Sequence, residues 1–280
     1  MKGKKKVEDK VKEFETELLR EEKKQNTVKQ YLKYINDFIE YANIERKEDI
    51  TKEKLIEYKE HLKEVHKKES SINIKIIIIN KFIAFIGLPE KYKLKQIKTQ
   101  RKTNLENVLN EKEYQRLLEW AMKLNKITMY YLMRTLAGTG IRISELQYIT
   151  VEAVKKGEAV FDSKGTVERK AFINKKLQKE LLKYCKEEGI KTGIIFKSRN
   201  GNPLDSAYIY KEIQWIAGQA RIKKSKAHPH SFRHLFAKNY LSKPGHNIAD
   251  LKNILGHKNI STTEIYLQKS TRELKETLED

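Results

Sequence analysis

Apolar residues recur every three or four positions over residues 7–95 of this 280-residue chain. Examples are Phe14 and Leu18 and, further on, Ile35 and Phe38, with charged or polar side chains between them. Such spacing is that of an amphipathic α-helix with one apolar face. It predicts four or five short helices that together form a small all-α domain.

Cap residues indicate where two of these helices begin and end. Asn26 or Thr27 is expected to cap a helix over residues 28–41, because their side chains accept hydrogen bonds from free backbone N–H groups. A second helix, over residues 74–86, is expected to end at Gly87.

The helical pattern is lost between residues 91 and 104, in the segment KYKLKQIKTQRKTN. It has no apolar period and no acidic residue, and Lys or Arg occupies nearly every second position. This composition is typical of a solvated linker. We therefore place a basic linker at residues 96–107, between an N-terminal domain of residues 1–95 and a C-terminal domain of residues 108–280.

The C-terminal domain is predicted to be mainly helical, with one small β-hairpin. Asn110, followed three residues later by Glu113, has the spacing of a capping box at a helix start. The segments EAVFD and VERKAFI alternate apolar and polar residues on either side of SKG, which predicts two strands and a tight turn. Further helices are expected over residues 130–137, from about Ser144 and from Lys175 onward, with a turn at residues 138–140. The fold class is therefore mainly α with a small β-sheet.

The charge of the chain indicates a polyanionic partner. Lys and Arg number 59 against 38 Asp and Glu, which gives a formal net charge of +21 and a pI near 9.6. Basic residues are spread along the whole chain and do not form a short tail beside an apolar anchor, which favours nucleic acid over a membrane surface. A lysine-rich proteome is the alternative source of this charge.

Cysteine usage and hydropathy favour a cytoplasmic protein without a membrane partner. The single Cys185 cannot form an internal disulfide, which fits a reducing compartment. The first residues pass directly into charged amphipathic sequence, without the apolar core of a signal peptide. The most apolar run, residues 76–85, is far shorter than the roughly 20 residues that a membrane span needs.

Two short clusters place polar residues three positions apart. In GTGIRISEL, Arg142 and Glu145 would share a helix face, and the preceding glycines would let the backbone approach a ligand; a surface ion pair is the simpler alternative. In HPHSFRH, His230 and Arg233 have the same spacing. A phosphate-handling pair fits this box, and a zinc site is the alternative, although neither Cys nor an acidic residue lies within it.

Two further candidates lie in a hairpin and near the C-terminus. His257 follows Gly256 in LGHKNISTTEIYL, and Tyr266 lies one turn inside the next expected helix. A tyrosine in that position is more often a core or interface residue than a nucleophile. Lys164, at the tip of SKG, is an ordinary surface residue when it is considered alone.

In their order along the chain, the clusters around Arg142, Lys164, His230 and Tyr266 resemble the motifs of the tyrosine recombinase (phage integrase) family. This family includes Xer-type resolvases and conjugative-transposon integrases. TGIRISEL is similar to the family's TGxRxSEL motif, and SKGTVERKAFI to its GKGxKxR strand-turn-strand, where Lys170 is a rival to Lys164. PHSFRHLFA is similar to PHxxRHxFA, and LGHKNISTTEIY to LGHxxxxTTxxY. The segment NTVKQYLKYINDFIEYA looks like the first long helix of the family's core-binding domain.

This resemblance implies a helical, SAM-like core-binding domain followed by a mixed α+β catalytic domain. It implies an enzyme that cleaves and rejoins double-stranded DNA through a 3'-phosphotyrosine, with no metal, ATP or other cofactor. The catalytic positions that it implies are Arg142, Lys164, His230, Arg233, His257 and the nucleophile Tyr266, with Glu145 in a supporting position. Contacts with DNA phosphates are expected from Lys29, Lys95, Lys98, Arg101 and Lys102, and a homotetramer on two DNA sites is expected.

These residue types suit the cleavage of a phosphodiester. Arginine remains protonated at biological pH and binds phosphate oxygens in a bidentate way, which stabilises the charge that builds up there. The tyrosine hydroxyl, with an ordinary pKa near 10, attacks phosphorus, and the leaving 5'-hydroxyl needs a proton, for which Lys164 is the candidate donor. His230 would accept the tyrosine proton, and His257 would hydrogen-bond the phosphate.

Three alternatives stay open at this point. A non-catalytic DNA-binding regulatory or architectural protein on the same scaffold would be expected to lose at least one catalytic position. A metal-dependent nuclease would use the histidine-rich box and would lose its activity in EDTA. A type IB topoisomerase uses similar chemistry, but the short N-terminal domain and the Xer-like motifs favour a recombinase.

Overall fold

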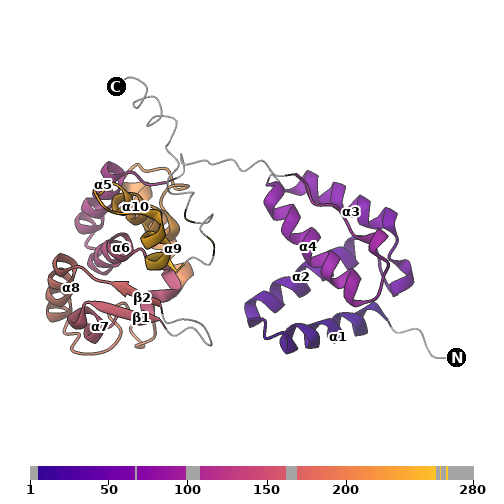
Figure 1. The fold of residues 1–280 in the computed structure, drawn as a ribbon, viewed down its shortest axis with the longest axis horizontal. Helices are drawn as coiled ribbons and strands as arrows, with labels where there is room; N and C mark the ends of the chain where they lie inside the picture. Colours follow the sequence, from indigo (N-terminus) through magenta and orange to yellow (C-terminus); the bar gives the residue numbers. More distant parts are fainter. Residues whose placement is uncertain are drawn as a thin grey trace, which may run out of the picture. The chain divides into compact units, whose positions relative to one another are not determined.

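Two units make up the fold, and each has a hydrophobic core of its own. The computed structural model describes residues 6–66, 68–98, 108–161 and 169–256, together with Asn259 and Thr263. Contacts between Cα atoms group residues 1–102 into one unit and residues 103–280 into the other. Figure 1 shows helices in both units and a small sheet in the second. The predicted fold class, mainly α with a small β-sheet, is confirmed.

The first unit is a set of helices packed around α4. Its α-helices are α1 (Val7–Arg20), α2 (Gln25–Tyr41), α3 (Lys52–Val65) and α4 (Glu69–Phe85), and its short 3-10 helices are η1 (Lys47–Asp49) and η2 (Glu90–Tyr92). Ile76, Ile79 and Phe82 of α4 are fully buried, and α4 packs against both α2 and α3. The apolar period of the sequence thus reports the faces that meet in this core.

Two of these helices begin earlier than their predicted starts. α2 begins at Gln25 with Lys24 at its N-cap, so the predicted caps lie inside its first turn, and α4 begins at Glu69. Neither start has a side-chain cap, and the residues around both are mostly exposed, where water satisfies free N–H groups. The predicted end at Gly87 is correct, because its φ of +70° is the left-handed conformation that ends helices.

The segment after η2 is bound to the first unit, which corrects the expectation of a solvated linker over the whole of residues 91–104. Leu94 is buried, and its N–H and C=O bond to the side-chain amide of Asn80 at 2.8 and 2.9 Å. Asn73, two turns earlier on α4, bonds in the same way to both backbone groups of Ile97, at 2.8 and 2.9 Å. An asparagine amide can replace a neighbouring strand here because it carries one acceptor and a donor.

The second unit packs α6 among several other helices. Its α-helices are α5 (Glu111–Lys123), α6 (Ile127–Thr139), α7 (Val151–Lys156), α8 (Lys175–Glu187), α9 (Ser206–Gln219), α10 (Pro229–Leu241) and α11 (Ile248–Leu255), with a 3-10 helix η4 (Ile143–Tyr148). α6 contacts α5, α8, α9 and α10, and Leu132 and Leu136 on it are fully buried. The predicted capping box of Asn110 and Glu113 opens α5 and is confirmed.

The predicted hairpin is present as strands β1 (Glu158–Phe161) and β2 (Arg169–Phe172). They pair antiparallel, with Glu158 opposite Phe172 and Phe161 opposite Arg169. The turn between them, which contains Lys164, lies outside the described residues. No helix in the described part of the chain has both the length and the apolar character needed to cross a membrane.

The connection after α6 differs from the predicted turn, whereas the helix predicted from about Ser144 is present as η4. α6 continues to Thr139, so the turn consists of Gly140 with a φ of +65°, and the following helix is of the 3-10 type. A Cβ on Gly140 would lie 2.4 Å from Cδ1 of Phe236. The glycine therefore allows α10 to pack against this turn.

Candidate active site

Arg142 stands at the start of η4, where its backbone and its side chain both bind Glu145. Oε2 of Glu145 accepts the backbone N–H of Arg142 at 2.7 Å, and Oε1 accepts from its Nη1 at 2.9 Å. The Glu145 side chain is 14% exposed, whereas that of Arg142 is 45% exposed. The carboxylate thus orients Arg142 and leaves part of its guanidinium open to solvent.

His230 and Arg233 share one face at the start of α10. Pro229 occupies the first helical position, where a backbone N–H would have no intrahelical partner. Arg233 is 1% exposed, and it donates from Nη1 to the Gly140 carbonyl and from Nη2 to the Leu255 carbonyl, both at 2.6 Å. Arg233 therefore joins α10 to the turn after α6 and to the end of α11.

These side chains line one pocket of about 580 Å³. Its basic lining consists of Arg142, His228, His230 and Arg233, and Ser206 and Tyr210 of α9 form another part of its wall. Arg142 is thus brought together with His230 and Arg233, which lie far from it in the sequence, as the motifs predicted. The other predicted catalytic residues, Lys164, His257 and Tyr266, lie outside the described residues.

The pKa of His230 is held below its ordinary value of 6.5. Desolvation on its packed side is the largest cause, and the positive charges of Arg233, His228 and Arg142 lower the pKa further. Burial also lowers the pKa of His228. His230 is therefore mainly neutral near pH 7, the form in which a ring nitrogen accepts a proton.

Arg169 of β2 reaches the same cluster and is not among the site residues that the motifs predicted. Its Nη1 forms an ion pair with Oε1 of Glu145, and its Nε donates to the Ile254 carbonyl at 3.2 Å. Its side chain is 12% exposed. Two signals point to it: the arginine that ends the GKGxKxR motif falls on Arg169, and strand alternation places Arg169 on the same inward face as the buried Ala171.

Lys170, the rival to Lys164, lies on the opposite face of β2. Its side chain is 42% exposed, and its Nζ lies 3.4 Å from Oε1 of Glu158 on the partner strand. Lys170 therefore pairs across the hairpin on its outer face. Glu145 is contacted from the inward face by Arg169.

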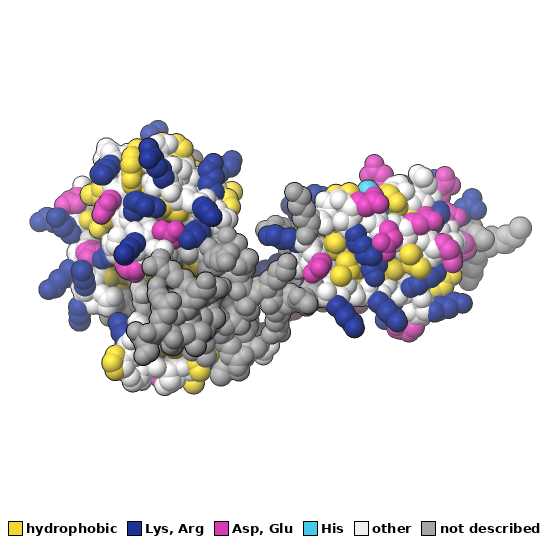
Figure 2. All heavy atoms as spheres, turned by 90° about the horizontal axis from the view of Figure 1, so that it is seen from above, with side chains coloured by type: hydrophobic (Ala, Val, Ile, Leu, Met, Phe, Trp, Pro, Cys, Tyr) yellow, Lys and Arg dark blue, Asp and Glu magenta, His cyan; other side chains and the backbone are white. Residues whose placement is uncertain are grey.

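The predicted DNA-contacting residues that the structure describes are all exposed. Lys29 lies on α2, and Lys95 and Lys98 alternate with the inward Leu94 and Ile97 in the segment after η2. Arg101 and Lys102 lie outside the described residues. Figure 2 shows Lys and Arg side chains spread over the visible face of the second unit, where acidic side chains are fewer.

Residues 107–273 match the model of the phage integrase family, and residues 11–87 match that of the phage integrase N-terminal SAM-like domain. The first match covers more than half of the 280 residues. This chain belongs to the phage integrase family. The two integrase models follow each other in the order that the motifs implied.

Curated relatives of this integrase-family chain include two tyrosine recombinases. XerC of Lactobacillus delbrueckii subsp. bulgaricus is 32% identical over 145 residues, which are 49% of this chain and 48% of the relative. XerD of Staphylococcus aureus is 32% identical over 182 residues, 61% of each chain. The aligned part of the chain thus spans less than two thirds of the length of these relatives.

The integrase fold is also found by structural comparison. A lambda integrase tetramer bound to a Holliday junction superposes with a TM-score of 0.78, at 18% identity, over 96% of this chain and 80% of that chain. At this level of identity the similarity shows the fold alone. It covers both the SAM-like and the catalytic part of the family.

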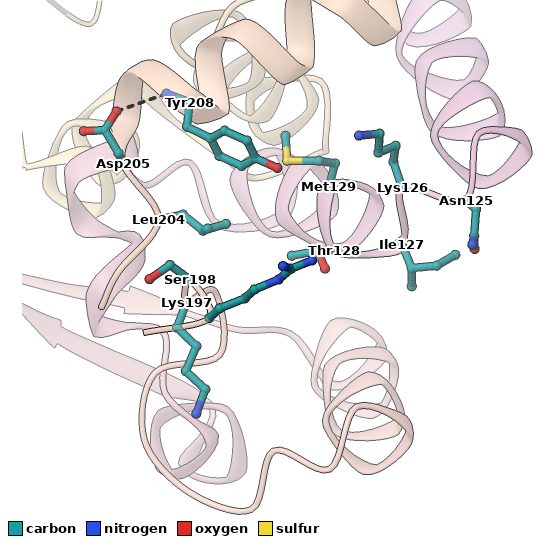
Figure 3. Close-up of a pocket in the computed structure, with 11 residues that line it drawn as sticks. Asn125, Lys126, Ile127, Thr128, Met129, Lys197, Ser198, Leu204, Asp205 and Tyr208 are labelled. Atoms are coloured by element: carbon teal, nitrogen blue, oxygen red, sulfur yellow. Dashed lines mark hydrogen bonds between the residues drawn. The ribbon is translucent and has the colours of Figure 1, made fainter. Parts of the chain in front are cut away.

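A second pocket of the integrase unit, of about 600 Å³, lies between the start of α6 and the loop before α9 (Figure 3). Figure 3 shows the Tyr208 ring pointing toward Met129, and Oδ1 of Asp205 accepts the backbone N–H of Tyr208 at 3.1 Å. Lys126 on its wall is paired with Glu212 at 2.9 Å. The described catalytic candidates do not line this pocket, so it is separate from the candidate active site.

The histidine box of this integrase was also weighed as a zinc site. Among the described residues, no three His, Cys, Asp or Glu side chains gather where they could hold a metal ion. Nε2 of His228 is instead 3.1 Å from Oγ of Ser231, and His234 is buried. The described part of the box therefore gives no support to the zinc alternative.

Proposed function

We propose that this chain is a site-specific DNA recombinase that cleaves and rejoins duplex DNA through a covalent 3'-phosphotyrosine, without metal or ATP. The observation that carries the proposal is the single pocket in which Arg142, His230 and Arg233 meet. Membership of the phage integrase family supports it, as do the names of the relatives XerC and XerD, both tyrosine recombinases.

Arg142 and Arg233 would bind the non-bridging oxygens of the scissile phosphate. Both line the pocket, and each is oriented before DNA binds: Arg142 by Glu145, Arg233 by the Gly140 and Leu255 carbonyls. Donors that are already oriented stabilise developing charge without a reorganisation cost during the reaction. Glu145 thus acts by positioning Arg142.

Tyr266 would be the nucleophile of the reaction. Its phenol oxygen would form a bond to phosphorus while the bond from phosphorus to the DNA 5'-oxygen breaks. His230, neutral near pH 7, would accept the phenol proton, and Lys164 would donate a proton to the leaving 5'-hydroxyl. His257 would donate a hydrogen bond to the phosphate. Lys164 is preferred to Lys170, because Lys170 is directed to Glu158 on the outer face of the hairpin.

We keep the predicted order of a core-binding domain at residues 1–95, a basic linker at 96–107 and a catalytic domain at 108–280, with the start of the linker held to α4 through Ile97. The core-binding domain and the linker would contact DNA phosphates through the predicted residues Lys29, Lys95, Lys98, Arg101 and Lys102. Two DNA sites would be held by a homotetramer in the cytoplasm, and the lambda integrase tetramer on a Holliday junction supports this assembly.

The experiment begins with the unknown DNA site. DNA fragments retained by the protein are sequenced, and the site so found is built into a nicked duplex from which the cleaved end diffuses away. The chain should form a protein–DNA adduct that resists SDS, disappears on proteolysis and forms equally well in EDTA. Tyr266→Phe should abolish the adduct, whereas Tyr208→Phe, an exposed tyrosine in the second pocket, should not.

The possible results separate the candidate functions. An adduct that persists in Tyr266→Phe would refute the nucleophile. Sequence-specific binding without any adduct would support the non-catalytic architectural protein, and strand cleavage that EDTA abolishes would support a metal-dependent nuclease. Relaxation of supercoiled DNA with no exchange of strands between two sites would support a topoisomerase.

A further inference from the structure

Arg169 lies in the interior of the second unit, between the hairpin, η4 and the end of α11. Its guanidinium carbon is 4.9 Å from the centre of the Phe161 ring on the partner strand. Its Cδ occupies the space beside Gly256, where an added Cβ would lie only 2.2 Å away. Gly256 also has a φ of +64°, so both its backbone and its neighbour require glycine.

Packing alone does not explain an arginine at this position. Burial of a guanidinium costs free energy, and here it is the largest influence on the pKa of Arg169, which it lowers. Among the residues that the structure describes, its Nη2 has no hydrogen-bond partner. An apolar residue on this inward face would avoid both costs, so the guanidinium must act on the groups that it contacts.

The first contact is electrostatic. Glu145 lies between two guanidinium groups, those of Arg142 at 2.9 Å and of Arg169. With Arg142 alone, the pair would have no net charge, and a phosphate would compete with the carboxylate for the same guanidinium. Two positive charges and one negative charge leave the trio at +1, so Arg142 can bind Glu145 and still attract a phosphate.

The second contact holds the end of α11. The last carbonyls of a helix have no intrahelical partner and form the negative end of its dipole. Arg169 binds the Ile254 carbonyl at 3.2 Å and Arg233 binds the Leu255 carbonyl at 2.6 Å. The partly buried Arg169 and the buried Arg233, from different elements, therefore anchor consecutive carbonyls, three and two residues before His257 in the sequence.

We propose that Arg169 is a positioning residue of the candidate active site: it offsets the charge of Glu145 so that Arg142 stays available to a phosphate, and it anchors the end of α11. This inference rests on the proposed function for its effect on DNA cleavage. Its effect on phosphate affinity does not, because binding of an anion at Arg142 requires no reaction.

Four variants of the full-length chain separate the two contacts. Arg169→Met removes the charge and both polar contacts and retains an unbranched side chain, whereas Arg169→Lys retains the charge but not the planar fork that reaches Glu145 and Ile254 together. Glu145→Gln removes the carboxylate, alone and combined with Arg169→Met. Arg116→Met, at an exposed position of α5, is the matched control.

The first measurement is the affinity for inorganic phosphate. Binding is monitored through the change in the NMR signal of His230 as phosphate is added. Arg169→Met should weaken phosphate binding by roughly tenfold, and addition of Glu145→Gln should restore most of the loss. Arg169→Lys should bind phosphate nearly as well as the unchanged protein. A purely structural role would make the double variant no better than Arg169→Met, and that result would overturn the proposal, as would unchanged binding in Arg169→Met.

The second measurement is the single-turnover rate of adduct formation at saturating nicked DNA. Misplacement of reacting groups by about 1 Å costs on the order of 100-fold in rate, so Arg169→Met should slow the step by about that factor. Its DNA dissociation constant should change little, and Arg169→Lys should fall between the two. If the unchanged protein forms no adduct, the proposed function fails, while the phosphate titration still decides the role of Arg169.

Discussion

The guanidinium of Arg233 is almost completely buried, yet it lines the pocket that is proposed to bind DNA phosphate. Its two bonds of 2.6 Å tie the Gly140 carbonyl, two residues before Arg142, to the Leu255 carbonyl, two residues before His257. One side chain thus fixes the spacing of two segments that carry other site residues. Arginine suits this role because its planar fork offers several donors in fixed directions.

The pKa of His230 gives a prediction at the scale of a single ring. An NMR titration of its imidazole signal should have its midpoint below 6.5, because packing and the nearby positive charges disfavour the protonated form. Arg142→Gln should raise the midpoint, since Arg142 is one of those charges. Arg116→Gln, which removes the same charge from an exposed position, should leave it unchanged. A midpoint above 6.5 would contradict this account.

The same pKa shift sets the direction in which stability depends on pH. His230 binds its proton more weakly in the folded chain than in the unfolded chain, so the unfolded chain carries more protons in this range. The free energy of unfolding should therefore decrease as the pH falls below about 6.5. His230→Gln should reduce this dependence, while His228, whose pKa is also lowered, retains a contribution of the same sign.

The sequence was sufficient to name Arg142, His230 and Arg233, because each belongs to a short motif with a fixed spacing. Arg169 was missed because its partners are remote: Glu145 is 24 residues away and Ile254 is 85 residues away. The motif GKGxKxR contains an arginine at this position, but it does not show the partners, which only the hairpin and the end of α11 bring to Arg169. The packing of Phe236 beside Gly140 is likewise a remote contact that the local sequence does not show.

At the scale of elements, periodicity predicted which helices exist, but several of their limits differ from the predicted ones. α6 runs through Gly138, where the sequence placed a turn, because Leu177 of α8 packs into the space that a side chain would fill, 2.8 Å from a virtual Cβ. α4 begins before its first strongly apolar residues, since an exposed first turn needs no apolar face. The limits of a helix thus depend on neighbours that the local sequence does not contain.

The attachment of the segment after η2 depends on two asparagines and can be tested by hydrogen exchange. In Asn80→Ala, both backbone groups of the buried Leu94 lose their partner. An unsatisfied buried group costs about 1–3 kcal/mol, so protection of the Leu94 amide should fall roughly ten- to a hundredfold. Asn73→Ala should have the same effect on the amide of Ile97.

A matched control for these variants is Asn26→Ala, at an exposed position in the first turn of α2. It should leave the protection of both amides unchanged, because the partners of Leu94 and Ile97 are Asn80 and Asn73. Asn26 also caps no helix, so its loss should not destabilise α2. Trypsin should cut after Lys95 faster in Asn80→Ala than in the control. Protection of Leu94 in Asn80→Ala and of Ile97 in Asn73→Ala that equals the protection in the control would show that the asparagines do not hold this segment.

At the scale of the whole molecule, the chain has two separate hydrophobic cores and a large excess of positive charge. The first unit has its core around α4 and the second has its core around α6, and the chain as a whole carries a formal charge of +21. Composition predicted this charge, and with it the class of partner. Lys95 and Lys98 are exposed because Leu94 and Ile97 face inward. The basic composition of the segment did not predict that these two apolar residues pack against the first unit.

The affinity for duplex DNA should therefore fall steeply as the salt concentration rises, because each lysine on a phosphate releases bound counterions. On a logarithmic plot, each phosphate contact contributes roughly 0.9 to the slope, so Lys29→Ala, Lys95→Ala and Lys98→Ala together should reduce it by roughly 3. Lys183→Ala, with a side chain 73% exposed on α8, is a control that removes one charge away from the predicted contacts. If that single control reduces the slope as much as any one of the three, the charge acts as a diffuse field. A smaller reduction of the slope in Lys183→Ala than in each of the three other variants would instead locate the DNA along α2 and the segment after η2.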